Sequence, residues 1–408
     1  MKIIYLILFA LIVLTSCSPK ESATVESPPE ITAQAEAAFA LPLPEKEEIF
    51  EIEANEEASE EPEEKTVAEK ILAGMSMEEK LGQLFICAFR KDASGRAHTG
   101  MNPQAEEAVG DYYIGGVVFF RENIVSEEQT REYISDLQGA SEIPLFIGID
   151  EEGGMVRRTQ SLNVASVGSQ FNIAKKGESA VYEASQIIAD YIKPMGFNLN
   201  FAPVADVFSN PANTVIAERA FGSDEKTVST MVPLAVAAYN EAGIISVLKH
   251  FPGHGDTLED SHYGSAFTQK TLDEIRETEL RPFAAGIEAG APMVMVGHIA
   301  APQINGNNEP AVFSHKLVAE ILRGEMGFCG VIITDAMDMG ALDSYGAAES
   351  AVKAFEAGID ILLMPSDYKA AYAGLRQALA TGRITQAQLD AKVLRILECK
   401  EKFMGLNY

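Results

Sequence analysis

Short runs of apolar residues, rich in Val, Ile and Phe, recur along the chain from about residue 67 to its end. The eight runs lie at residues 84–89, 114–120, 144–150, 199–206, 245–250, 293–298, 331–335 and 361–364. Segments with apolar positions at helical spacing separate many of them, at residues 126–140, 180–195, 226–242, 272–289 and 315–326. Continuous apolar strands that alternate with amphipathic helices are typical of a parallel sheet covered by helices. The pattern therefore predicts an α/β fold.

Eight strands fit one (β/α)₈ TIM barrel that occupies residues 67–408 as a single catalytic domain. A doubly wound parallel sheet is the alternative. It is disfavoured because no glycine-rich phosphate loop follows the first apolar run.

Ionisable residues stand at the ends of five of these strands. In chain order they are Asp150, Asp206, Lys249, His250, His298 and Asp335. Active sites of TIM barrels form at the carboxyl ends of the strands. One such residue could be a helix cap or part of a structural ion pair, but convergence of five strands favours a catalytic site.

The first residues have the form of an export signal. Met1 and Lys2 precede an apolar run at 3–14, and Leu14-Thr15-Ser16-Cys17 follows. The run is short for a membrane span and suits the core of a signal peptide. The small residues before Cys17 resemble the lipobox of bacterial lipoproteins, so residues 1–16 are interpreted as a lipoprotein signal peptide and Cys17 as the lipid attachment site. An ordinary secretory signal is the alternative.

Residues 17–66 differ in composition from the rest of the chain. From Ser18 to Thr66 there are 15 glutamates and 3 lysines, within a chain of net charge −28. Such a segment cannot bury enough apolar surface to fold, so we expect a disordered acidic tether. The acidic balance also argues against nucleic acid as a partner. The expected location is the cell envelope, at the outer membrane or the outer face of the inner membrane, and Ser18 favours the outer membrane.

The remaining cysteines are Cys87, Cys329 and Cys399, an odd number of widely spaced residues. Cys87 and Cys329 lie within apolar segments, where cysteine usually serves as a small buried residue. We therefore expect neither a disulfide framework nor a cysteine-rich metal site.

The segment after the fifth strand is rich in chemical groups. Residues 249–257 read Lys-His-Phe-Pro-Gly-His-Gly-Asp-Thr, residues 260–262 read Asp-Ser-His, and residues 333–337 read Ile-Thr-Asp-Ala-Met. Together they resemble glycoside hydrolase family 3, in its β-N-acetylglucosaminidase branch, and the resemblance covers residues 67–408. It implies a barrel enzyme that retains anomeric configuration, with Asp335 as nucleophile and His262, paired with Asp260, as acid/base.

The chemistry supports these roles independently. A retaining glycosidase needs a carboxylate that attacks the anomeric carbon and a nearby proton donor. Histidine, with a reference pKa near ~6.5, can give and take a proton around neutrality. Asp260 can accept a ring N–H bond from His262 and favour the protonated ring. Seen without the motif, His262 would be interpreted as a surface histidine on a polar loop.

The same resemblance implies the substrate-binding residues. Residues 150–158 match the family's Asp-x-Glu-Gly-Gly-x-Val-x-Arg run, in which Asp150 and Arg158 contact sugar hydroxyls; Arg219, in a second run at 216–222, and Lys249 with His250 complete the set. A carboxylate and fixed cations suit recognition of vicinal hydroxyls and an acetamido carbonyl.

This chain departs from the family pattern at two positions. Glu151 replaces a usual Gln, and Met155 stands where Arg is common, which bears on what binds beyond the terminal sugar. Asp206 supports the site or serves as an ion-pair partner; the sequence leaves both open.

The predicted function is therefore a monomeric, cofactor-free exo-β-N-acetylglucosaminidase that hydrolyses terminal β-linked N-acetylglucosamine from short glycans, with peptidoglycan fragments favoured over chitin oligosaccharides. The absence of tryptophan, which limits stacking platforms to Phe and Tyr, also favours short fragments.

Three alternatives remain open. One is a metal-dependent barrel hydrolase that uses His250, His254, Asp256, Asp260 and His262. Another is a phosphorylase of the same family. The third is an inert, glycan-binding lipoprotein, which would need no nucleophile and acid together.

Overall fold

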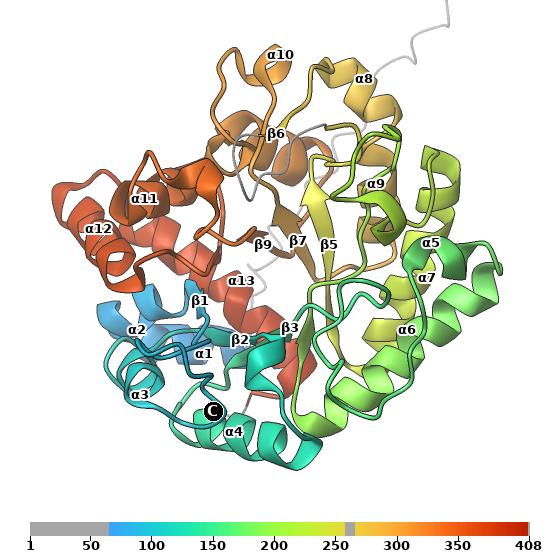
Figure 1. Cartoon of the computed structure of the whole chain (residues 1–408). Coiled ribbons are helices and arrows are strands. Elements are labelled where there is room, and N and C mark those ends of the chain that lie inside the picture. The colour runs from blue at the N-terminus through green and yellow to red at the C-terminus, as the bar shows by residue number, and fades with distance from the viewer. Residues whose placement is uncertain (1–64, 258–265, 407–408) are drawn as a thin grey trace, which may run out of the picture. The chain divides into compact units, whose positions relative to one another are not determined.

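A parallel sheet rolled into a barrel forms the centre of the molecule (Figure 1). The computed structural model describes residues 65–257 and 266–406. The strands are β1 (Phe85–Cys87), β2 (Gly116–Phe119), β3 (Phe146–Ile149), β4 (Leu199–Asn200), β5 (Ile245–Phe251), β6 (Ala266–Phe267), β7 (Met293–Val296), β8 (Ile299–Ala300), β9 (Val331–Thr334) and β10 (Leu362–Leu363).

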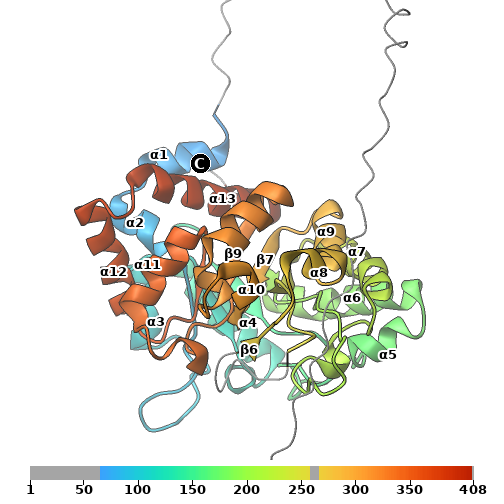
Figure 2. The ribbon, with the colours of Figure 1, turned by 90° about the horizontal axis from the view of Figure 1, so that it is seen from above.

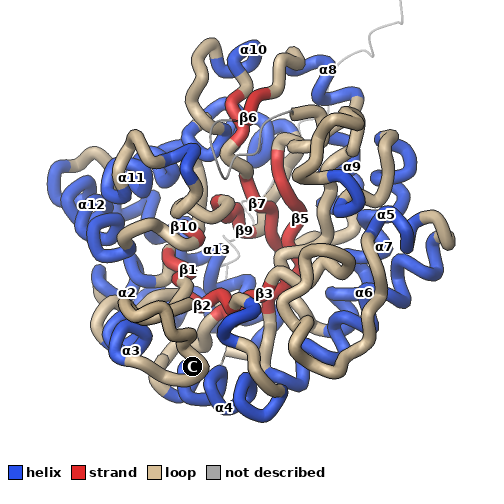
Figure 3. The backbone as a smooth tube through the Cα atoms, in the orientation of Figure 1, coloured by secondary structure: helices blue, strands red, loops and turns tan. Residues whose placement is uncertain are grey.

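Eight of these strands pair in the order β10-β1-β2-β3-β4-β5-β7-β9, and every pairing is parallel. The first and last strands in this order meet through a parallel bridge between Ile333 and Ile361, and the Thr334 N–H donates to the Ile361 carbonyl (3.0 Å). Figure 3 shows the strands as a ring with helices around it. The predicted (β/α)₈ barrel is confirmed.

Helices surround the ring. They are α1 (Val67–Gly74), α2 (Met77–Gly82), α3 (Pro103–Gly110), η1 (Arg121–Asn123), α4 (Glu127–Gly139), α5 (Gln170–Ala174), α6 (Glu178–Ile192), η2 (Lys193–Met195), η3 (Ala217–Arg219), α7 (Glu225–Ala242), α8 (Leu272–Glu277), α9 (Leu280–Glu288), α10 (Pro302–Asn305), η4 (Ala311–Phe313), the π-helical η5 (Lys316–Glu325), η6 (Gly340–Leu342), α11 (Ala347–Ala357), α12 (Tyr368–Thr381) and α13 (Gln386–Met404).

The helix α13 closes the end of the barrel where the strands begin. The Lys400 Nζ donates to the Gly115 carbonyl, just before β2, at 3.0 Å. The helix α1 packs beside α13, and the Ala68 N–H donates to Glu401 Oε2 (3.1 Å). Figure 2 shows α1 and α13 together at the end of the molecule opposite β6. The carboxyl ends of the strands are thus left for the functional site.

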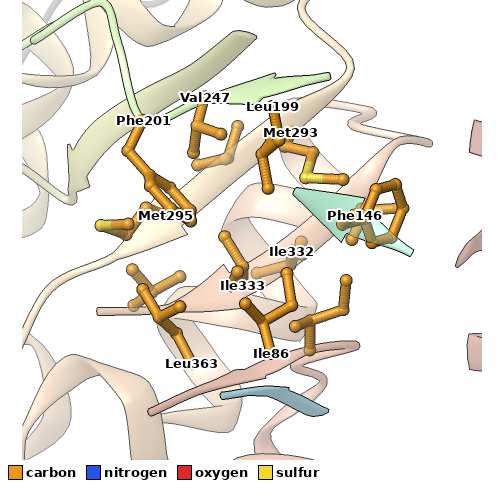
Figure 4. Close-up of a cluster of buried hydrophobic side chains, with 14 of the residues drawn as sticks. Ile86, Phe146, Leu199, Phe201, Val247, Met293, Met295, Ile332, Ile333 and Leu363 are labelled. Atoms are coloured by element: carbon orange, nitrogen blue, oxygen red, sulfur yellow. The ribbon is translucent and has the colours of Figure 1, made fainter. Parts of the chain in front are cut away.

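The barrel is filled with apolar side chains from successive strands. Figure 4 shows this cluster, with Ile86, Phe146, Leu199, Phe201, Val247, Met293, Met295, Ile332, Ile333 and Leu363. Each of them is at most 4 % exposed. The strands are therefore buried on both faces, which explains why they read as continuous apolar runs rather than as alternating patterns.

The predicted elements differ from the observed ones in detail. The run at 199–206 is a regular strand only over β4. The residues after it stay beside β5, because Ala202, Pro203 and Ala205 share backbone hydrogen bonds with β5 and Val204 forms an isolated bridge to Lys249. The segment 272–289 is two helices, α8 and α9, since Thr278 has φ −124° and ends the first. Cys87 is buried as expected. The expectation for Cys329 was wrong: it is exposed because it lies in the turn between η5 and β9.

The predicted signal peptide (1–16), the acidic tether (17–66) up to residue 64, Cys17, Asp260 and His262 lie outside the described residues. Among the helices that the structure does describe, none has the length and apolar character needed to cross a membrane.

Candidate active site

A pocket of about 160 Å³ opens at the carboxyl ends of the barrel strands. We call it the central pocket. Its polar lining side chains are Asp150, Glu152, Arg158, Arg219, Lys249, His250, His254 and Asp335. Asp150 directly follows β3, Lys249 and His250 lie in β5, and Asp335 directly follows β9. The barrel geometry thus brings residues 185 positions apart to one cavity.

Asp150 carries two cationic partners. Its Oδ1 accepts from Lys249 Nζ and its Oδ2 accepts from Arg158 Nη2, both at 3.0 Å. Burial alone would raise the pKa of this carboxyl, but the charges of Lys249 and Arg158 hold the pKa far below its ordinary value. Asp150 is therefore a fixed anion whose neighbours are oriented donors, an arrangement suited to sugar hydroxyls.

Glu152 is a further anion of the pocket that the sequence did not single out. It is 2 % exposed and accepts two bonds from Arg219, Nε to Oε2 (2.9 Å) and Nη2 to Oε1 (2.8 Å). Lys249 Nζ lies 2.7 Å from the same Oε1. Burial opposes ionisation, yet Arg219 and Lys249 lower the pKa of Glu152. The available signal was the Asp150-Glu151-Glu152 run, because three acids at the end of a buried strand need cationic partners.

Glu151 stabilises the loop after β3 and does not line the central pocket. Its Oε2 accepts from the Arg158 N–H (2.7 Å) and the Thr159 N–H (3.1 Å), and its Oε1 accepts from the Thr159 and Tyr191 hydroxyls at 2.6 and 2.8 Å. It is fully buried. These bonds fix the backbone of Arg158, so the position where the family commonly has Gln serves the pocket indirectly.

Asp206 lies behind His250. Its Oδ2 is 2.7 Å from His250 Nδ1, and its Oδ1 accepts from the backbone N–H groups of His250 (3.1 Å) and His254 (2.7 Å). On the other side of the ring, Nε2 is 3.3 Å from Arg219 Nη2. Since arginine only donates, these partners assign the hydrogen to Nδ1. Asp206 thus orients His250, which is the supporting role that the sequence left open.

His254 is held within the wall of the pocket. Its Nδ1 lies 2.7 Å from the Thr257 hydroxyl, and its carbonyl accepts from Asn213 Nδ2 at 2.7 Å. Burial, followed by the neighbouring His250, lowers the pKa of His254. The ring is therefore biased toward its neutral form and leaves the positive charges of the pocket to lysine and arginine.

Asp335 is the carboxylate at the end of β9. Its Oδ1 accepts from the Ala336 N–H (2.8 Å), and its own N–H donates to the Val296 carbonyl (2.9 Å). Burial raises the pKa of Asp335, but His250, His298, the Ala336 N–H and Lys249 together lower it below the ordinary value. The side chain is therefore an anion at neutral pH.

His298, at the end of the sixth barrel strand, does not line the central pocket. It is fully buried, and its Nε2 lies 2.8 Å from the Ala336 carbonyl. It thereby holds the backbone immediately after Asp335.

Six of the predicted site residues therefore share one pocket: Asp150, Arg158, Arg219, Lys249, His250 and Asp335. The predicted pair Asp260 and His262 lies outside the described residues, so its role stays a prediction. Within 65–257 and 266–406, no group of three or more His, Cys, Asp or Glu side chains could hold a metal ion.

The chain is similar to known glycoside hydrolases in both sequence and structure. The chain matches the family described as "Glycosyl hydrolase family 3 N terminal domain" over residues 76–399. It is 36 % identical over 352 residues to Beta-hexosaminidase A of Pseudoalteromonas piscicida, and 37 % identical over 279 residues to a Beta-hexosaminidase of Xanthomonas euvesicatoria. Among solved structures, a glycoside hydrolase family 3 beta-N-acetylglucosaminidase from Paenibacillus superposes with a TM-score of 0.77 at 33 % identity.

These relatives differ in length. The match covers 78 % of this chain but 59 % of the Pseudoalteromonas protein, and 82 % of this chain but 64 % of the Paenibacillus protein. It covers 66 % of this chain and 82 % of the Xanthomonas protein. The chain thus spans about three fifths of the longer relatives.

Proposed function

Because the chain belongs to glycosyl hydrolase family 3, we propose that it is a retaining exo-β-N-acetylglucosaminidase that releases terminal β-linked N-acetylglucosamine from short glycans. One observation carries the proposal. An ionised Asp335 shares a pocket of about 160 Å³ with the charged cluster around Asp150 and Lys249. Ligand pockets for drug-sized molecules span roughly 300–1,000 Å³, so this smaller volume suits one terminal sugar.

In the proposed first step, the Asp335 carboxylate attacks the anomeric carbon. The bond from this carbon to the glycosidic oxygen breaks, and the oxygen takes a proton as the leaving sugar departs. Asp335 is suited to this step because it is ionised and because the Ala336 N–H holds one of its oxygens. The other oxygen is available for the covalent bond.

The proton donor we propose is His262, oriented by Asp260; both lie outside the described residues. After departure of the leaving sugar, the neutral imidazole takes a proton from water. The water oxygen attacks the glycosyl ester, Asp335 is released, and the product keeps the β configuration.

Substrate recognition follows from the fixed charges. Asp150 can accept from two adjacent hydroxyls, whereas Arg158 and Lys249 donate beside it. Arg219 is anchored by Glu152 and His250, so its guanidinium is positioned before a ligand arrives. Such preorganisation reduces the entropy that substrate binding has to overcome.

The test is turnover of nitrophenyl β-N-acetylglucosaminide by the wild-type protein and by Asp335→Asn. We expect the variant to lose at least about a thousandfold in kcat, as for other nucleophiles. Wild-type inactivity would contradict the proposed activity, and equal turnover by both proteins would contradict the role of Asp335.

Two added reagents separate the remaining alternatives. Activity lost with EDTA and restored by zinc would identify a metal-dependent hydrolase, which could use His250, His254 and Asp256 with Asp260 and His262. Formation of sugar 1-phosphate when phosphate replaces water as acceptor would identify a phosphorylase. We expect hydrolysis that is insensitive to both reagents.

We further propose that the protein acts in the cell envelope, held by a lipid on Cys17, with residues 17–66 as a tether. There it would meet peptidoglycan fragments outside the inner membrane. Digestion of defined muropeptides beside chitobiose tests the substrate; faster cleavage of chitobiose would contradict the peptidoglycan assignment.

A further inference from the structure

A second pocket, of about 420 Å³, lies at the same end of the barrel. We call it the rim pocket. Its polar lining includes Arg90, Lys91, Gln104, Glu122 and Ser366. Arg90 and Lys91 follow β1, and Ser366 follows β10, so the rim pocket lies over these two neighbouring strands. On one side β10 is next to β9, the strand that Asp335 follows, and on the other side β1 is next to β2.

The two pockets adjoin each other. Met364 lines both of them. Phe120 lines the central pocket, and its ring contacts one arginine of each pocket. The Arg158 Cζ, in the central pocket, is 5.0 Å from the ring centroid, and the Arg90 Cζ, in the rim pocket, is 4.2 Å from it. The two pockets therefore share a wall at Met364.

The shared residue Met364 is itself held in an unusual conformation. Its φ is +49°, in the left-handed region that side chains other than glycine rarely adopt. Its N–H donates to the Ile86 carbonyl (2.8 Å), which fixes it against β1. Such backbone conformations are frequent at ligand-binding sites.

The rim pocket combines an apolar base with a polar edge. Cys87 and Phe89 are buried, whereas Arg90, Lys91 and Gln104 are exposed. The Arg90 Nε donates to Glu122 Oε1 at 2.7 Å, which leaves the other edge of the guanidinium for a ligand. Donors and acceptors around an apolar base are the surroundings that a pyranose ring, with its equatorial hydroxyls and apolar faces, requires.

The central pocket is too small for a whole oligosaccharide. At about 160 Å³ the central pocket is smaller than the roughly 300–1,000 Å³ of ordinary ligand pockets, so we assign it one sugar and the unit on the far side of the cleaved bond binds elsewhere. We propose that the rim pocket binds this second sugar, the leaving group of an oligosaccharide substrate, and that Lys91 and Gln104 donate to its hydroxyls. This inference rests on the proposed glycosidase function.

The test compares two substrates on one preparation: nitrophenyl β-N-acetylglucosaminide, whose leaving group has no sugar hydroxyls, and chitobiose, whose leaving group is a second sugar. The variant is the double substitution Lys91→Ala and Gln104→Ala. We expect kcat/KM for chitobiose to fall at least about fivefold, as for the loss of one or two hydrogen bonds, and kcat/KM for the nitrophenyl glycoside to stay within about twofold. The matched control is Lys226→Ala, which removes an exposed lysine on α7, and it should change neither value.

A second variant blocks the rim pocket sterically, so its effect does not depend on the strength of single hydrogen bonds. Ser366→Tyr adds a ring at the edge of the rim pocket, and we expect it to raise KM for chitobiose. An equal effect on both substrates, or no effect of either variant on chitobiose, would overturn the rim-pocket assignment. Failure of the wild-type protein to cleave the nitrophenyl glycoside would instead overturn the proposed function, so the two failures are distinguishable.

Discussion

At the scale of single residues, the central pocket depends on cations shared between carboxylates. Lys249 Nζ contacts both Asp150 (3.0 Å) and Glu152 (2.7 Å), and Arg219 contacts both Glu152 and His250. Because these groups are removed from bulk water, each charge requires its partners. A single substitution is therefore expected to affect the whole cluster.

Glu152→Gln tests this dependence. The change leaves the buried Arg219 without its carboxylate partner and leaves Lys249 with Asp150 alone, and we expect the free energy of unfolding to fall by about 3–5 kcal/mol. Urea unfolding measures it. The control is Glu349→Gln, which breaks an exposed pair with Arg383 and should cost less than about 1 kcal/mol. Equal losses in the two variants would contradict the account.

The pH profile tests the environment of Asp335. The proposed nucleophile, Asp335, must be ionised, and His250 and His298 help to lower its pKa. His298→Gln removes one of these causes, while the amide can still donate to the Ala336 carbonyl. We therefore expect the acid limb of kcat/KM to move to higher pH. An acid limb that stays in place or moves to lower pH would show that His298 does not act on Asp335.

At the scale of elements, the sequence predicted the barrel because its strands are buried on both faces and its helices are periodic. The end of β4 could not be predicted, since Ala202 to Ala205 continue the apolar run and stay hydrogen-bonded to β5, although they do not form regular strand. The break between α8 and α9 was missed in the same way: Glu279 is buried and paired with Lys270, a contact that no local period reveals.

The site residues also divide into those that a local sequence pattern reveals and those that depend on tertiary contacts. Asp150, Lys249, His250 and Asp335 can be identified because they stand at strand ends, whereas Arg158 and Arg219 follow from the resemblance of their runs to the family. Glu152 was not selected, because its importance comes from Arg219, 67 positions away. Lys400 was not noticed either, because a lysine on an amphipathic helix ordinarily reaches solvent.

The helix α13 carries that lysine. Lys400 is fully buried, its Nζ donates to Gln83 Oε1 (2.7 Å) and to the Gly115 carbonyl, and burial lowers its pKa to about 7. The unfolded value is near ~10.4. Between these values the unfolded chain binds more protons, so stability rises with pH by up to about 1.4 kcal/mol per unit.

Lys400→Met should remove the part of this rise that Lys400 contributes, whereas Lys392, whose burial lowers its pKa to about 8, keeps the rest. Urea unfolding between pH 7 and 9 measures it, a window below the titration of the buried tyrosines, and Lys402→Met on the same helix is the control. The same dependence of stability on pH in the wild-type protein and in Lys400→Met would contradict the burial of a titrating lysine.

At the scale of the whole molecule, residues from Glu63 to Tyr408 form one compact unit. The capping box at Thr66 supports this boundary, because Thr66 Oγ1 accepts from the Glu69 N–H and Glu69 Oε2 accepts from the Thr66 N–H. We propose that the segment before Glu63 determines where the protein is held in the cell and takes no part in the reaction.

A chain that begins at Glu63 should therefore keep kcat/KM for the nitrophenyl glycoside within about twofold of the full chain, since a domain with its own core can fold alone.

In cells, Cys17→Ser should abolish incorporation of labelled fatty acid and move the activity out of the membrane fraction. Fatty-acid labelling that persists in the variant would contradict attachment at Cys17.

The covalent role of Asp335 is the central claim, and a trapped intermediate tests it most directly. The protein is incubated with a 5-fluoro derivative of N-acetylglucosamine that carries a good leaving group at the anomeric carbon, and the digested protein is examined by peptide mass spectrometry. We expect the fluorosugar on the peptide that contains Asp335, attached to that carboxylate. Attachment to Asp150 or Glu152, or a protein that turns over substrate but never acquires the label, would contradict the account.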